Sequence, residues 1–327
     1  MPEAQKELLR AEGLTKVFPT GRRDQAVHAV SGVDLTIYEG ETLALVGESG
    51  CGKSTLGRTL IRMLPATAGK VYFHGQDIAA MKDKDFRPLR RRLQMVFQDP
   101  YASLDPRMTV RDIIAEPLET YHVCANRQAT TARVLELMQA VGIPAEFLHR
   151  YPHQFSGGQR QRIGIARAIA LQPELIVCDE PVSALDVSVQ SQVLNLFKDL
   201  QEKLGLTYLF IGHDLSVIHV IADRVCVMLL GTVCEVAPKE ELYAKPLHPY
   251  TSFLLDAIPQ ADPHRRDRPR QVLTGEVPSP LDLPGGCCFH TRCPYATERC
   301  RTERPALRAF GGRQVACHRA EELDLNR

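Results

Sequence analysis

The stretch at residues 47–55, GESGCGKST, constrains this chain more than any other part of it. It matches the phosphate-binding pattern G-x-x-x-x-G-K-[ST]. The apolar run at 42–46 before it predicts a buried strand, and residues 56–64 after it predict a helix. Glycines let such a loop curl its N–H groups into a nest, and the helix N-terminus adds its dipole. This context favours a nucleotide-phosphate site over a chance glycine-rich turn.

Residue types within the loop assign its chemistry. Lys53 supplies a mobile positive charge for the β- and γ-phosphates, Ser54 a hydroxyl for Mg²⁺, and Thr55 a contact for the α-phosphate. The other loop residues are expected to line the phosphates; they are Gly47, Glu48, Ser49, Gly50, Cys51 and Gly52.

Length and charge exclude several classes of protein. A chain of 327 residues allows roughly two domains. The net charge of +1 gives no global field that would recruit nucleic acid or anionic lipid. The polar N-terminus has no apolar region of a signal peptide behind it, and no apolar run approaches the length of a spanning helix. We therefore expect a soluble protein, whose role at a membrane would need partner subunits.

Two strand patterns add candidate ligand contacts. Residues 8–18 and 27–38 alternate in polarity, which predicts a small antiparallel sheet. Phe18 ends the first of these runs, where it either stacks on an adenine ring or packs in the sheet. A later strand at 93–100 gives way to a loop at Gln98, whose amide could reach a ligand at the sheet's carboxyl edge.

A helical pattern and a second glycine motif follow. Residues 109–148 have helical periodicity, which indicates a helical insertion and not another βαβ unit. The motif Ser156-Gly157-Gly158-Gln159 then precedes a helix expected from about 159 to 171. A serine N-cap with two glycines at a helix start is a second candidate anion site.

Carboxylates and one histidine lie at the ends of later strands. The apolar strand from 175 ends in Asp179 and Glu180, so that Asp179 can hold Mg²⁺ through water and Glu180 can act on another water as a base. A lone Asp-Glu pair would favour a turn, but the upstream phosphate loop reverses that preference. Asp186 precedes an amphipathic helix at 188–204, and His213 ends a further strand, where a single histidine is more often structural.

The last 41 residues contain a block of cysteines: Cys287, Cys288, Cys293, Cys300 and Cys317. A linker is expected at 259–284 before it. In a reducing compartment such a block suggests metal before disulfide, although the spacing lacks the C-x₂-C knuckles of structural zinc. Four thiolates, those of Cys287, Cys293, Cys300 and Cys317, can hold a [4Fe–4S] cluster. Zinc held by three cysteines and His290 or His318 is the alternative, and a loop with free thiols is the third.

Taken together, these motifs resemble the ATP-binding cassette ATPases over nearly the whole chain. They stand in the family's order: phosphate loop, Q-loop, signature, Walker B strand, D-loop and switch histidine. One departure is Phe155, where leucine more commonly leads the signature. The resemblance implies an α/β P-loop NTPase with a RecA-like core, an N-terminal antiparallel β subdomain and an inserted helical subdomain at about 99–160. The nucleotide-binding domain is expected at 1–245 and a small Cys-rich extension at 246–327.

The resemblance also implies how the site works. ATP bound at Lys53 of one subunit would be covered by Ser156–Gln159 of another, with Asp186 of the D-loop also at the nucleotide. Mg²⁺ would be held by Ser54, Gln98 and Asp179. Glu180 would polarise the attacking water, His213 would sense the γ-phosphate, and Phe18 matches the adenine-stacking position. No catalytic position is replaced, so the chain is expected to be an active ATPase.

Within that family the chain is most similar to the ATP-binding subunits of dipeptide and oligopeptide importers. Residues 98–110, 246–251, 286–296 and 315–318 carry this likeness, and the cysteine spacing looks like that of a [4Fe–4S] site in some of these subunits. It implies a heterodimer with a sister ATPase, two transmembrane permease subunits and a periplasmic peptide-binding protein, on the cytoplasmic face of a bacterial inner membrane, without nucleic acid. An importer of another small solute, such as nickel or glutathione, and a soluble cassette ATPase without a transport role are the alternatives.

Overall fold

The computed structural model describes residues 5–21, 25–258, 278–279 and 281–325. The chain divides into two compact units, one formed by Met1–Ala80 with Gly212–Arg327 and the other by Met81–Ile211. The first unit therefore joins two segments that are distant in sequence. Most of the expected linker at 259–284 lies outside the described residues.

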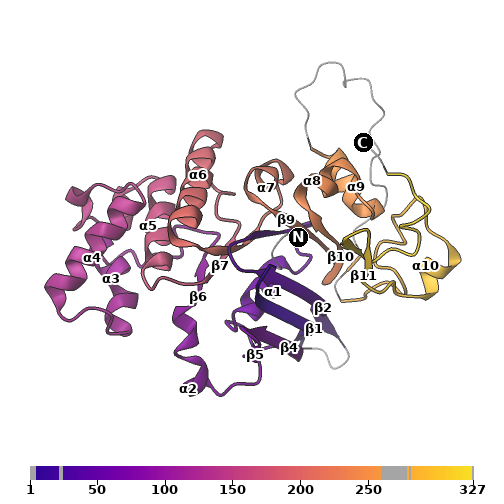
Figure 1. Ribbon diagram of the computed structural model, residues 1–327, viewed down its shortest axis with the longest axis horizontal. Coiled ribbons are helices and arrows are strands. Elements are labelled where there is room, and N and C mark those ends of the chain that lie inside the picture. Colours follow the sequence, from indigo (N-terminus) through magenta and orange to yellow (C-terminus); the bar gives the residue numbers. More distant parts are fainter. Residues whose placement is uncertain (1–4, 22–24, 259–277, 280, 326–327) are drawn as a thin grey trace. The chain divides into compact units, whose positions relative to one another are not determined.

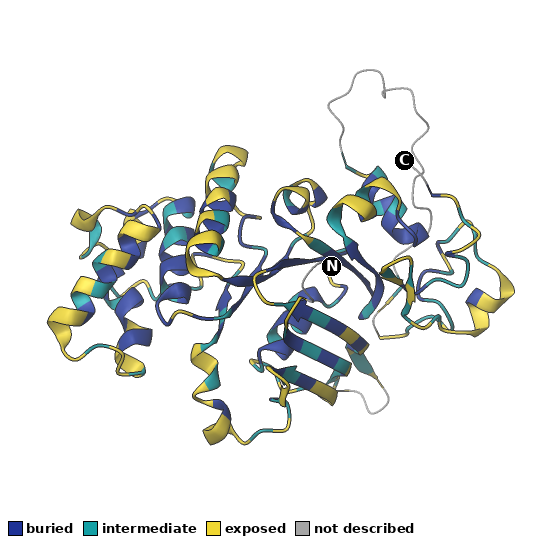
Figure 2. Cartoon of the chain, in the orientation of Figure 1, coloured by how far each residue is buried: buried dark blue, intermediate teal, exposed yellow. Residues whose placement is uncertain are grey.

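An antiparallel sheet opens the first unit, as the alternation predicted. Its strand order is β2-β1-β4-β5, and β1 pairs with β2 in a register that places Leu14 opposite Val33. Buried and less buried residues alternate along these strands (Figure 2), because successive side chains of a strand point to opposite faces. The strands are β1 (Glu7–Pro19), β2 (Ala26–Tyr38), β4 (Ala68–Phe73) and β5 (Gln76–Asp77).

A second set of strands in this unit has the order β11-β12-β10-β9-β3. Strand β3 is parallel to β9 and buried along its whole length, which is usual for a parallel strand covered on both faces. The predicted hairpin at 224–236 is confirmed, with Gly231 at φ 77° in its turn. The strands are β3 (Thr42–Val46), β9 (Arg224–Leu229), β10 (Thr232–Pro238), β11 (Arg308–Phe310) and β12 (Arg313–Val315).

The helices of the first unit are short. The helix after the phosphate loop begins at Lys53, three residues earlier than predicted, because the loop's last residues already form its first turn. It ends at Leu60, before the predicted end at 64, and Arg62 has a positive φ of 55°. These helices are α1 (Lys53–Leu60), α7 (Leu215–Ile221), α8 (Lys239–Ala244), α9 (Pro249–Asp256) and α10 (Glu298–Thr302).

The second unit contains three parallel strands in the order β8-β7-β6 and most of the longer helices (Figure 1). The predicted helical insertion at 109–148 is confirmed by two helices, α3 and α4. The strands are β6 (Leu93–Val96), β7 (Leu175–Asp179) and β8 (Thr207–Ile211). The helices are α2 (Asp83–Phe86), α3 (Val110–Thr120), α4 (Arg127–Ala140), α5 (Gly157–Ile169) and α6 (Val187–Leu204), with 3₁₀ turns η1 (Leu89–Arg91), η2 (Ala145–Phe147) and η3 (Pro152–Gln154).

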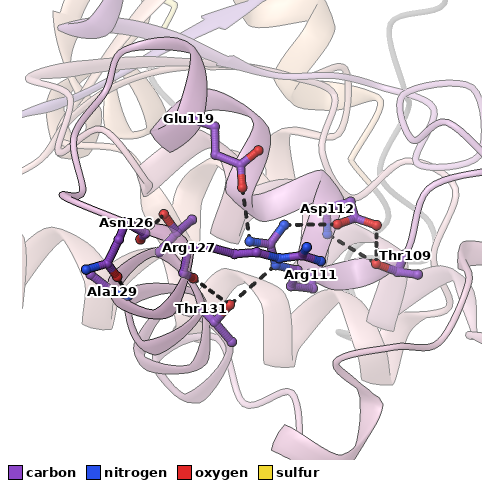
Figure 3. Close-up of polar contacts among 9 residues, drawn as sticks. Thr109, Arg111, Asp112, Glu119, Asn126, Arg127, Ala129 and Thr131 are labelled. Atoms are coloured by element: carbon purple, nitrogen blue, oxygen red, sulfur yellow. Dashed lines mark hydrogen bonds and ion pairs between the residues drawn. The ribbon is translucent and has the colours of Figure 1, made fainter.

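A buried arginine joins α3 to α4 (Figure 3). Arg111 on α3 is only 7% exposed and forms ion pairs with Asp112 and Glu119 of its own helix. Its Nε donates to the Thr131 hydroxyl on α4 at 3.4 Å. Because a buried guanidinium needs compensating charge and hydrogen bonds, these contacts fix the two helices of the insertion together.

Within the described ranges, every helix is too short or too polar to cross a lipid bilayer.

Candidate functional site: a nucleotide-binding loop and its partner motifs

The phosphate loop follows β3 and depends on two glycines. A Cβ on Gly47 would lie 2.1 Å from the Met228 carbonyl oxygen, and one on Gly52 would lie 1.9 Å from the Ala29 carbonyl oxygen. Gly52 also has φ 101°, in the left-handed region that other residues rarely adopt. The loop therefore runs against neighbouring backbone and leads directly into α1, and a helix N-terminus favours a bound anion.

Lys53 is held inside the loop. Its side chain is 5% exposed, and its Nζ donates to the carbonyl oxygens of Gly47 (2.9 Å) and Glu48 (3.0 Å). Burial raises the pKa of the nearby Cys51 thiol, so this cysteine is a packed neutral group in the loop. The ammonium of Lys53 is thus placed where phosphate oxygens can replace loop carbonyls as its partners.

Two further predicted residues lie in the same unit. Phe18, on β1, is half-buried and pairs with Val27 in the sheet, and the Lys16 ammonium lies 5.0 Å from its ring centroid. His213 is exposed and directly precedes Asp214, whose carboxylate caps α7. Adenine stacking by Phe18 and phosphate sensing by His213 stay predictions.

In the second unit the structure brings together two residues that were predicted separately. Glu180 follows β7 with a φ of 45°, unusual for a residue with a side chain. Its N–H donates to the Ile211 carbonyl at 3.0 Å, which fixes the backbone, and the Gln98 amide donates to its carboxylate at 2.9 Å. Asp179, one residue before, is fully buried at the end of β7. A positioned carboxylate beside an amide is suited to orienting a water molecule.

The glycine motif at 156–159 forms the start of α5. The Ser156 hydroxyl accepts from the Gln159 N–H, and the Gln159 side chain accepts from the Ser156 N–H, which is a capping box. Gly158 is required locally, since a Cβ there would lie 2.3 Å from the Val189 side chain. The unusual Phe155 is buried and packs edge-to-face on Phe147, 5.6 Å between ring centroids.

Asp186 caps the following helix. Its carboxylate accepts from the Ser188 hydroxyl at 2.6 Å and from the Val189 N–H at 3.0 Å. These hydrogen bonds, that of Ser188 first, lower the pKa of Asp186, so the group is a carboxylate over a wide pH range. A contact of Asp186 with nucleotide stays a prediction.

The cysteine block of the first unit surrounds a small hollow. Cys287, Cys293, Cys300 and Cys317 all line it, together with both histidines named as alternatives, His290 and His318. Its volume is about 20 Å³, little more than one water molecule needs. Burial raises the pKa of Cys287 to about 12 and that of Cys293 to about 11, and neighbouring thiols add to both shifts. Among the described residues, no three His, Cys, Asp or Glu side chains already form an arrangement that could hold a metal ion.

Sequence reasoning gave no role to two residues that contact the phosphate loop. Arg292 forms an ion pair with Glu48, and the Tyr250 hydroxyl accepts from the Glu48 N–H. Both partners are more than 200 positions away from Glu48, so no local pattern could reveal them. The signal in the sequence was indirect: Tyr250 lies in the stretch 246–251 and Arg292 in 286–296, two of those that resemble the importer subunits.

The fold and the loop define a P-loop nucleotide-binding protein of α/β class. A family model for ABC transporters matches residues 30–183, and one for the oligopeptide/dipeptide transporter C-terminal region matches 234–300. The oligopeptide transport ATP-binding protein OppF of Salmonella typhimurium is 52% identical over 91% of this chain and 90% of its own length. AppF of Bacillus subtilis, another oligopeptide transport ATP-binding protein, is 51% identical over 96% of this chain and 98% of its own.

Solved structures of ATP-binding cassettes have a similar fold. A dimeric ATP-binding cassette in a post-hydrolysis state with ADP and Pi matches 71% of this chain and 99% of its own at TM-score 0.65 and 29% identity. A part of the CbiONQ transporter complex from Clostridium perfringens matches 73% of this chain and 91% of its own at TM-score 0.64 and 27% identity. The chain belongs to the ATP-binding cassette family of ATPases, in the branch that carries the oligopeptide/dipeptide transporter C-terminal region. As such an ATPase it uses ATP with Mg²⁺.

Proposed function

We propose that this chain is the ATP-hydrolysing subunit of a bacterial ABC importer for dipeptides or oligopeptides. The observation that carries the proposal is identity above 50% with oligopeptide transport ATP-binding proteins along about nine-tenths of both chains. The match includes the C-terminal region, which lies outside the cassette itself.

We infer the partners from the same likeness. A sister ATPase would complete a heterodimer, two transmembrane permease subunits would bind it at the cytoplasmic face of the inner membrane, and a periplasmic protein would deliver peptide. In that dimer the candidate lid at 156–159 would cover nucleotide bound to the other subunit.

The residues divide the chemistry of hydrolysis among them. Lys53 and the loop N–H groups would bind the phosphates, with the remaining loop residues, Gly47 to Thr55, shaping the cradle. Ser54, Gln98 and Asp179 offer the oxygen ligands that Mg²⁺ prefers. The metal would draw charge from the phosphates when bound.

The other residues would act on water and on the bound nucleotide. Glu180, held by Gln98, would polarise the attacking water and accept its proton as a base, and His213 would contact the γ-phosphate. Phe18 would stack on adenine, and Asp186 would contact the nucleotide.

Replacing Glu180 by Gln tests this assignment. The change keeps the shape and the hydrogen bond to Gln98 but removes the base, so ATP turnover should fall about 100-fold or more while the Kd for ATP changes little. With ATP bound, the variant and its sister ATPase should then accumulate as a dimer, measured by size-exclusion chromatography with light scattering. Glu174→Gln, at the other end of the same strand and paired with Arg92, is the matched control and should keep its turnover. Wild-type turnover by the Glu180 variant would remove that residue from the mechanism.

Transport specificity needs its own measurement. Cells lacking this chain should lose uptake of labelled dipeptides or oligopeptides and regain it with the wild-type chain but not with Glu180→Gln. Restored uptake of nickel or glutathione alone would assign the importer to those solutes.

We further propose that the cysteine block holds a metal centre, a [4Fe–4S] cluster on Cys287, Cys293, Cys300 and Cys317. The convergence of four thiols on one hollow supports it, and so does the sparse apolar content of the extension, since small folds of this kind need a staple. Because burial raises the pKa of Cys287 and Cys293, these thiols would have to release their protons when a metal centre binds.

Metal analysis of anoxically purified protein decides between the alternatives. A cluster predicts about four iron atoms per chain and a broad absorbance near roughly 400 nm. Cys293→Ser should lose both, whereas Cys124→Ser, in the other unit, should keep both. A colourless protein with one zinc per chain would assign zinc, and metal-free protein would leave free thiols.

A further inference from the structure

The side chain of Arg292, in the C-terminal extension, forms an ion pair with Glu48 of the phosphate loop. Nη1 of Arg292 donates to Glu48 Oε2 at 2.9 Å, and Nη2 donates to Oε1 at 2.7 Å. The Arg292 side chain is 5% exposed and that of Glu48 22%. Both residues lie in the same compact unit. This is a two-bond fork between guanidinium and carboxylate, the strongest geometry such a pair can form.

The backbone of Glu48 is held as well. Its N–H donates to the Tyr250 hydroxyl at 3.0 Å, and its carbonyl accepts from Lys53 Nζ at 3.0 Å. Tyr250 is fully buried on α9 and packs on Phe289 of the extension at 5.4 Å between ring centroids. Glu48 therefore connects the phosphate-binding lysine to the extension through three separate contacts.

The negative charge of Glu48 explains why a compensating arginine would matter at a phosphate-binding loop. A loop that binds a triphosphate gains from every positive group and loses from every carboxylate near it. Glu48 places a carboxylate within the loop, two residues before Gly50. Arg292 compensates that charge, and because its fork is rigid it also holds the carboxylate to one side of the loop.

We propose that Arg292 is a positioning residue for nucleotide binding, which acts by neutralising and orienting Glu48 from the C-terminal extension. The extension is then part of the support of the ATP site. The proposal rests on the binding of ATP by the chain and not on which solute the importer carries.

Binding measurements on the full-length chain test the proposal. Arg292→Met should raise the Kd for MgADP about tenfold, which corresponds to about 1.4 kcal/mol. In the Glu48→Gln background the carboxylate that Arg292 compensates is absent, so the double variant Glu48→Gln with Arg292→Met should bind MgADP within about twofold of Glu48→Gln alone. Arg299→Met, which breaks an exposed ion pair with Glu303 in the same extension, should leave the Kd unchanged.

Loss of the Arg292→Met effect in the Glu48→Gln background separates this role from a general loss of folding, which would weaken binding in either background. An unchanged Kd in Arg292→Met would overturn the proposal, as would an equal, about tenfold rise on adding Arg292→Met to Glu48→Gln. If Arg292→Met fails to fold, Arg292→Lys takes its place. Lysine keeps the charge without the fork, so a rise in Kd of about two- to fivefold is expected, and a wild-type Kd contradicts the proposal.

Discussion

At position 158 there is room for a hydrogen atom and for nothing larger. The side chain of Val189, on α6, would lie 2.3 Å from an added Cβ. The glycine in the candidate lid therefore has a packing reason that is independent of nucleotide. Its neighbour Gly157 has more room, with the Leu185 side chain at 3.3 Å.

Gly158→Ala should displace the start of α5 and lower the free energy of unfolding by about 1–3 kcal/mol. ATPase activity should fall with it if Ser156–Gln159 forms the lid. Denaturant unfolding and turnover assays measure the two effects. Adding Val189→Ala should recover much of the loss by restoring space.

Gly164→Ala is the matched control for this prediction. It lies on the same helix, but an added Cβ there meets nothing within 4 Å. Alanine should leave stability unchanged or raise it by up to about 1 kcal/mol, because it favours helix. Equal losses at 158 and 164 would contradict the steric explanation.

The ends of apolar strands, taken together with the upstream phosphate loop, predicted Gln98 and Glu180 as site residues, and their roles stay predictions. Their mutual hydrogen bond and the left-handed backbone of Glu180 were not predictable, because both depend on how neighbouring strands meet. The pairing of Arg292 with Glu48 was hidden for a stronger reason: 244 positions separate the partners.

Among the elements, α9 shows how a buried polar group fixes a helix start. His248 is 2% exposed, and its Nδ1 accepts from the Tyr250 N–H at 3.0 Å as the N-cap. Its own N–H donates to the buried carboxylate of Glu235 on β10, which also accepts from the Leu247 N–H. Burial raises the pKa of Glu235 and lowers that of His248 to about 4.

The lowered pKa of His248 predicts the direction of a pH effect. The folded state holds a neutral imidazole, whereas the unfolded chain takes up a proton near its ordinary pKa of about 6.5. The stabilisation is therefore complete above pH 6.5 and is lost as pH falls toward 4, by at most about 3 kcal/mol.

His248→Asn provides the comparison, since asparagine caps helices but does not titrate. Unfolding free energies between pH 7 and 4.5 should fall less steeply for the variant than for the wild type. Parallel curves would mean that His248 does not set this dependence.

Element positions followed from a continuous apolar run in one case and from helical periodicity in another. The strand at 42–46 and the helix at 188–204 were predicted within a residue of their bounds. The start of α1 was wrong by three residues, because the pattern after a phosphate loop cannot show that the loop's own lysine and serine already have helical backbone.

On the scale of the whole molecule, the division into units could not be predicted from composition. The change in composition after Pro246 predicted a boundary near 245, which stays a prediction. The compact units instead join Met1–Ala80 with Gly212–Arg327, because strands from both segments pair, as β3 does with β9. The sequence of one strand alone does not reveal which distant strand it pairs with.

The small hairpin of β11 and β12 has a consequence for any shortened form of this protein. Strand β12 pairs with β10 through Glu235 and Val236. The outermost strand of this set is therefore β11, which has three residues and begins with an arginine, and not the seven-residue β10. Short, charged outer strands discourage chains from adding to one another. A chain truncated before residue 308 would expose the backbone edge of β10 to a second copy. Self-association of such a truncated chain in solution would therefore result from the truncation and not from the protein's own assembly.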